Sequence, residues 1–86
     1  MPELTDMRNI GKEMARKLAS VGIASPGQLE EIGAKQAFLT LKQRYPHICL
    51  VHLYALEGAI QNIGLDSLPE DTKKDLKAFS NFLKQP

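Results

Sequence analysis

The sequence predicts an all-α fold, a compact domain of five or six helices. Apolar residues recur at spacings of three and four along most of the chain. No sustained alternation of apolar and polar residues indicates a strand. The chain has 86 residues, 43% of them hydrophobic, so we expect a single domain with a small core over residues 1–86.

Turn and capping residues divide the first half of the chain. A short helix is expected from Pro2 to about Met7, followed by the turn Arg8-Asn9-Ile10-Gly11. The second helix is expected from about Lys12 to Val21, with Gly22 ending it. The run Ser25-Pro26-Gly27-Gln28 predicts a new helix, in which the serine is the cap and the glutamine completes a capping box.

The second half contains three further helices. Gly33 is expected to interrupt the third helix, and the fourth begins near Ala34 and must end before Pro46. The segment HICLVHLYALEGAIQNIG is apolar on most faces of a helix, which is typical of a central helix, and Gly64 is expected to end it. Ser67 and Glu70 predict another capping box, before a last helix to about Leu83.

A weak internal repeat relates two of these turns. Sliding the sequence by 22 positions aligns Met7, Ile10, Gly11 and Ala15 with Leu29, Ile32, Gly33 and Ala37. The repeated unit is a helix end, a tight turn and a helix start. Glu30 and Glu31 precede the second turn, whereas cations surround the first, so only the first turn is expected to hold a phosphate.

The first turn is therefore the candidate binding site. Backbone amides at a helix start carry partial positive charge, and nearby cations add to it. The candidate phosphate- or DNA-binding residues are Arg8, Asn9, Gly11, Lys12, Arg16 and Lys17. The alternative interpretation is an ordinary solvated helix face with a structural glycine, which the nearby Asp6 and Glu13 favour.

The run Ile-Gly-x-x-x-Ala, followed by a helix ending in Val-Gly-Ile, resembles the helix-hairpin-helix motif of DNA-binding and repair proteins. That motif usually has a second glycine two residues before the first, where this chain has Asn9. Asparagine tolerates a left-handed backbone better than most residues. The resemblance implies contact with a duplex phosphate without base readout.

Four longer runs cover almost the whole chain: MRNIGKEMARKLASVGI, QLEEIGAKQAFLTLK, ICLVHLYALEGAIQNI and LPEDTKKDLKAF. In this order and spacing they are similar to the C-terminal domain of the TfoX (Sxy) family. The resemblance implies a compact fold with tandem helix-hairpin-helix-like, SAM-like units, found in regulators of bacterial competence and as a free-standing protein. Those regulators carry a separate N-terminal domain, to which nothing in this sequence corresponds. The resemblance supplies no catalytic residue.

Charge and composition favour a binding module over an enzyme. The formal net charge is +1, so no overall field attracts nucleic acid or a membrane, and we expect a protein partner or a second copy, with weak nucleic-acid binding possible. No phosphate loop, nucleophile elbow or other catalytic motif occurs, and neither a cofactor nor a small-molecule substrate is expected.

The single cysteine indicates neither a disulfide nor a metal. Cys49 lies in an apolar run, so we expect it to be buried and the protein to be cytoplasmic. On one helix His47 and His52 would diverge, while Cys49 and His52 would lie side by side. Three ligands do not converge in this arrangement, and no metal site is expected.

Overall fold

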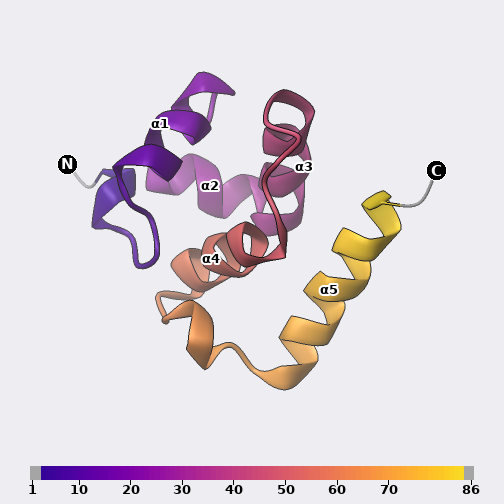
Figure 1. Cartoon of the computed structure of the whole chain (residues 1–86). Coiled ribbons are helices and arrows are strands. Elements are labelled where there is room, and N and C mark those ends of the chain that lie inside the picture. Colours follow the sequence, from indigo (N-terminus) through magenta and orange to yellow (C-terminus); the bar gives the residue numbers. More distant parts are fainter. Residues whose placement is uncertain (1–2, 85–86) are drawn as a thin grey trace.

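The computed structural model describes residues 3–84, and this part of the chain is all-α, without a strand (Figure 1). The predicted fold class is confirmed. In chain order the elements are the 3-10 turn η1 (Leu4–Asp6), α1 (Lys12–Ser20), α2 (Pro26–Ile32), α3 (Ala34–Arg44), α4 (Leu50–Gln61), the 3-10 turn η2 (Leu65–Ser67) and α5 (Glu70–Lys84). None of these helices is long and apolar enough to cross a membrane.

The predicted first helix is only one 3-10 turn. Pro2 lies outside the described residues, and the turn ends at Met7, whose backbone is extended with ψ 147°. The Met7 amide donates to the Leu4 carbonyl at 3.0 Å and closes the turn. Leu4 is buried and Met7 packs against the core, so these two side chains attach the segment.

The core is built around α4, which lies in the middle of the molecule and contacts α2, α3, α5 and η2 (Figure 1). The largest fully buried apolar side chains come from all five helices: Leu18, Leu29, Phe38, Leu41, Leu53, Leu56 and Leu76. Burying one such side chain stabilises the fold by about 2 kcal/mol. The predicted central helix is confirmed, but it is not covered on every side, since Val51 in its first turn is 56% exposed.

Local signals place the first three helices. Gly22 follows α1 with φ +90°, and Gly33, with φ +86°, both ends α2 and begins α3. Ser25 Oγ accepts from the Gln28 amide at 3.3 Å, as the capping box requires. The return bond differs, because Gln28 Oε1 accepts from the Ala24 amide at 2.8 Å, one residue before the cap.

The two turns of the internal repeat share one feature and differ in another. Gly11 and Gly33 each cap a helix, and their carbonyls accept from the amides of Ala15 and Ala37, both at 3.0 Å. In the second turn the glycine itself has the positive φ. In the first turn the positive φ falls on Asn9, at 69°, and Gly11 is extended.

The predicted end of α4 at Gly64 is wrong. The helix ends at Gln61, and Asn62 follows in the left-handed conformation with φ 60°. The Ile63 amide then donates back to the Gly58 carbonyl at 2.9 Å, which satisfies a terminal carbonyl of the helix. Asparagine adopts this conformation at lower cost than most residues and can end a helix as glycine does.

The prediction of a capping box formed by Ser67 and Glu70 is also wrong. Ser67 belongs to η2, and α5 begins at Glu70, where the Lys73 amide donates to the Pro69 carbonyl at 3.0 Å. Buried Leu68 lies between the two elements with an extended backbone, so the serine is too far upstream to cap the helix.

Candidate functional site

We call the turn Arg8-Asn9-Ile10-Gly11, which joins η1 to α1, the first hairpin. Asn9 is left-handed, Ile10 is buried, and Gly11 caps α1 from an extended conformation. Gly11, Lys12 and Glu13 are exposed, so the first turn of α1 faces solvent. The backbone therefore has the geometry on which a phosphate site at this helix start would depend.

The cations around this turn are separated by the fold. Lys12 and Arg16 line a groove beside η1, whereas Lys17 lines a different groove beside α4. Arg8 extends towards Gly64, where its Nη2 lies 3.6 Å from the position that a Cβ would occupy. The four predicted cations thus do not form one convergent positive surface, whereas Asn9, Gly11 and Lys17 line the same groove.

Arg16 is already paired. Its guanidinium donates to the Glu13 carboxylate, one helical turn earlier. The hydrogen bond and the charge of Arg16 lower the pKa of Glu13, and the same contact raises the pKa of Arg16. Both side chains are exposed, and such a pair contributes little to stability. The pair does neutralise the positive charge of Arg16, which a phosphate site would require.

Asn9 faces inward and holds the hairpin against the end of α4. Its Nδ2 donates to the Ile63 carbonyl at 2.9 Å, and its Oδ1 accepts from the Leu65 amide at 3.2 Å. A Cβ at Gly58 would lie 2.5 Å from Asn9 Nδ2 and 2.7 Å from the Ile63 carbonyl oxygen. Gly58 is therefore needed for this close approach, a role that the sequence alone did not reveal.

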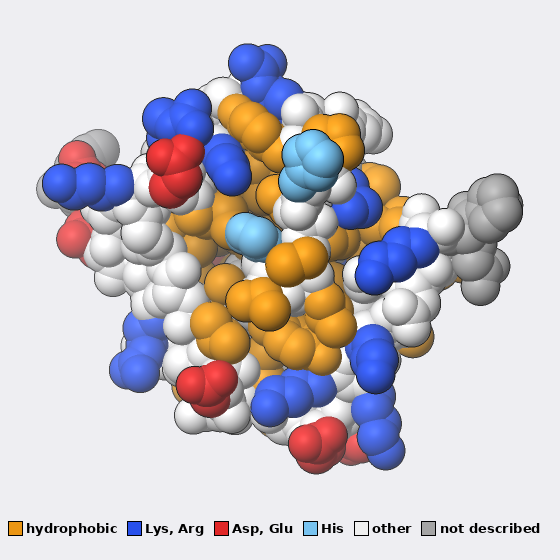
Figure 2. Space-filling model, viewed as in Figure 1, with side chains coloured by type: hydrophobic (Ala, Val, Ile, Leu, Met, Phe, Trp, Pro, Cys, Tyr) orange, Lys and Arg blue, Asp and Glu red, His pale blue; other side chains and the backbone are white. Residues whose placement is uncertain are grey.

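A groove that is partly apolar lies between the start of α1 and α4, and we call it the Val51 groove. It has a volume of about 320 Å³, and its apolar lining consists of Met14, Val51, Ala55 and Leu65. The rest of its lining is polar or glycine: Asn9, Gly11, Glu13, Lys17 and His52. Figure 2 shows hydrophobic side chains gathered over α4, with both histidines and several Lys and Arg side chains beside them.

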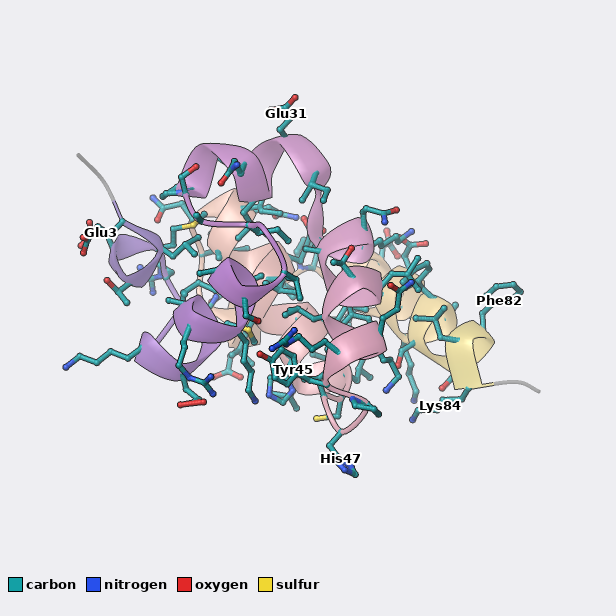
Figure 3. All side chains as sticks on the ribbon, turned by 90° about the horizontal axis from the view of Figure 1, so that it is seen from above. Glu3, Glu31, Tyr45, His47, Phe82 and Lys84 are labelled. Carbon is teal, nitrogen blue, oxygen red and sulfur yellow. The ribbon has the colours of Figure 1, made fainter. Side chains whose placement is uncertain are left out.

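A second hollow adjoins this groove, and we call it the Tyr45 cavity. It has a volume of about 240 Å³ and is lined by Lys17, Arg44, Tyr45, His47, Ile48 and His52. Tyr45 lies among the side chains between α1 and α3, while His47 projects from the loop that follows (Figure 3). Lys17 and His52 line both hollows, so the two are neighbours.

Tyr45 lines this cavity and contacts several of its neighbours. Lys17 Nζ and Arg44 Cζ lie 5.3 and 5.8 Å from the centroid of its ring. Its hydroxyl is 2.7 Å from Ser20 Oγ and accepts from Arg44 Nε at 3.3 Å. The hydrogen bond with Ser20, followed by the hydrogen bond and charge of Arg44, lowers the pKa of Tyr45.

The prediction that Cys49 is buried is wrong. Cys49 precedes α4 as its N-cap and is exposed, because a capping residue stands outside the helix. The predicted neighbour is confirmed: Cys49 Sγ lies 3.5 Å from His52 Nδ1, which also accepts from the Cys49 amide at 3.1 Å. Among residues 3–84, no three His, Cys, Asp or Glu side chains lie close enough to hold a metal ion.

One comparison with known proteins gives a family, and none supplies an activity. Residues 1–80 match the family described as TfoX C-terminal domain. An uncharacterized protein from Listeria monocytogenes, solved in a triclinic crystal form, is 39% identical, with a TM-score of 0.94 over 95% of this chain and 93% of its own. A Listeria monocytogenes protein of unknown function in a tetragonal form is 40% identical, with a TM-score of 0.92 over 94% and 99% of the two chains. No curated protein matches.

Proposed function

The chain belongs to the TfoX C-terminal domain family, and from this premise we propose that it is a non-enzymatic protein-binding module that docks its partner in the Val51 groove. We place it in bacterial regulation, in the cytoplasm. The exposed thiol of Cys49 supports a reducing compartment, because free exposed cysteines oxidise where disulfides form.

The exposure of Val51 carries the proposal. Val51 lies on the central helix beside Met14 and Leu65, and its side chain is 56% exposed. A partner that covers it removes apolar surface from water, which favours binding. Phe82 is more exposed, at 69%, but it projects alone from α5 near the end of the described chain (Figure 3). A single exposed apolar residue is common on protein surfaces, whereas a lined groove indicates a binding site.

The distribution of cations supports protein over DNA. A DNA site at the first hairpin needs several free cations on one surface, because phosphate contacts supply nearly all non-specific affinity. Here Arg16 is paired with Glu13, and Lys17 lies over Tyr45 on the opposite side of α1 from Lys12. Weak binding to a phosphate backbone is therefore secondary in the proposal.

Selection from a random peptide library displayed on phage tests the proposal. Such a library presents peptides of every composition to the Val51 groove. Selected peptides are then measured against wild type, Val51→Gln and the matched control Phe82→Gln. Both substitutions replace an exposed apolar residue with a polar one, so both variants should fold, which circular dichroism checks. We expect Val51→Gln to weaken binding at least about tenfold and Phe82→Gln to leave it unchanged. Equal binding by Val51→Gln, or no selected peptide, would reject the proposal.

A further inference from the structure

We infer that the Tyr45 cavity is an anion subsite, and that it receives an Asp or Glu carboxylate of the partner whose apolar side chain occupies the Val51 groove. This inference rests on the proposed function, because the partner is the same. It adds the partner's chemistry: an apolar side chain and an acidic one, close together on one segment.

The first argument is the charge of the lining. Two permanent cations, Lys17 and Arg44, and two histidines, His47 and His52, line the cavity, and no acidic residue does. Neither Lys17 nor Arg44 forms a salt bridge with the described part of the chain. Glu13, which lines the neighbouring groove, is paired with Arg16. No carboxylate lines the cavity itself, although the charge of Lys17 also reaches Glu13 in the neighbouring groove and lowers its pKa.

The second argument is that the two cations are held in place. Lys17 and Arg44 both lie against the ring of Tyr45, at 5.3 and 5.8 Å from its centroid. Arg44 Nε also donates to the Tyr45 hydroxyl, and that hydroxyl is hydrogen-bonded to Ser20. Cations fixed in this way lose less side-chain freedom when they bind an anion, and the remaining guanidinium N–H groups of Arg44 can pair with a carboxylate.

The third argument concerns the source of the anion. The cavity and the Val51 groove share Lys17 and His52, so one ligand can reach both. The groove lining combines four apolar side chains with the polar side chains of Asn9, Glu13, Lys17 and His52, a mixture that suits a protein segment carrying both kinds of side chain. The usual anion on a protein segment is an Asp or Glu side chain.

Small-molecule probes test the subsite without any partner. The ¹⁵N-labelled protein is titrated at low salt with blocked glutamate (N-acetyl glutamate N-methylamide), with blocked glutamine and with inorganic phosphate, while backbone amide signals are followed by NMR. We expect blocked glutamate to shift the signals of Tyr45, His47, Ile48 and His52 in a saturable way, and blocked glutamine to leave them in place. The double variant Lys17→Gln/Arg44→Gln should bind the glutamate probe at least tenfold more weakly than wild type.

The matched control is Lys12→Gln/Lys74→Gln, which removes two positive charges from helix positions outside the cavity lining. It should bind the probe as wild type does. Equal shifts with blocked glutamine, or equal binding by the Lys17/Arg44 variant, would overturn the subsite, and tighter binding of phosphate would overturn the carboxylate as its ligand. If the probe binds in the cavity while selected peptides ignore Val51→Gln, the subsite stands and the proposed function fails. If peptides depend on Val51 but the probe does not bind, only the subsite fails.

Discussion

The side-chain nitrogen of Asn9 donates to the backbone carbonyl of Ile63 at 2.9 Å, across 54 positions of sequence. The same side chain accepts from the Leu65 amide, so one asparagine joins the first hairpin to the segment after α4. Gly58 lies directly against this contact. The hairpin is therefore held by a long-range polar contact as well as by the buried Ile10.

Gly58→Ala should destabilise the protein. Inside a helix, alanine is normally better than glycine by about 1 kcal/mol. Here the added Cβ would lie 2.5 Å from Asn9 Nδ2 and 2.7 Å from the Ile63 carbonyl oxygen, so the hairpin must move away. We expect a net loss of about 2 kcal/mol, as for other overpacked sites, measured by urea unfolding. A variant as stable as wild type would show that the hairpin is not held this closely.

Gly33→Ala should be costly for a different reason. Nothing lies within 4 Å of a Cβ at Gly33, but its φ of +86° with ψ 157° is a conformation that residues with a side chain avoid. We expect a loss of about 2 kcal/mol in the free energy of unfolding. The control is Gly27→Ala, within α2 and with open space around it, which should be neutral or stabilising by up to about 1 kcal/mol. Equal effects at the two sites would contradict this explanation.

Cys49→Ser should stabilise the protein slightly. Cys49 caps α4 with sulfur, which accepts the His52 amide weakly, whereas serine is among the preferred N-cap residues. We expect a gain of about 0.5 kcal/mol relative to wild type and a larger one relative to Cys49→Ala, by thermal unfolding. A serine variant less stable than the alanine variant would contradict this explanation.

Wild type and the double variant Lys12→Glu/Arg16→Glu should bind duplex DNA with similar affinity. Arg16 is already neutralised by Glu13, and the remaining cations point to different grooves. A site that neutralised three or four phosphates would give a slope of about −3 in log affinity against log salt. We expect both proteins to bind weakly at low salt with a smaller slope. Strong wild-type binding that the variant loses would make the first hairpin a DNA site.

The sequence predicted the parts of the fold that depend on local signals. The cap at Ser25, the glycine at position 33 and the proline at position 46 each act within a few residues: α2 begins after Ser25, Gly33 separates α2 from α3, and α3 ends at Arg44, before the proline. The end of α4 was misjudged because the apolar spacing continues to Ile63. The chain leaves the helix earlier, at Asn62, and Ile63 is then held by Asn9, a contact that no local pattern shows.

The candidate site was less predictable. Tyr45 fits the apolar stripe of α3, but it stands at the end of that helix, where its ring faces Lys17 from α1. Val51 belongs to an apolar run whose other members are mostly buried, yet it is exposed beside a groove that α1 and α4 line together. Both features depend on how helices distant in sequence pack.

The footprint of a selected peptide on the ¹⁵N-labelled domain is the most direct test of the central claim. The account predicts that the largest backbone shifts occur at Met14, Val51, Ala55 and Leu65, with smaller ones at Lys17 and His52. Shifts centred on Lys12 in the first hairpin, or on Phe82 in α5, with the Val51 signals unchanged, would contradict it.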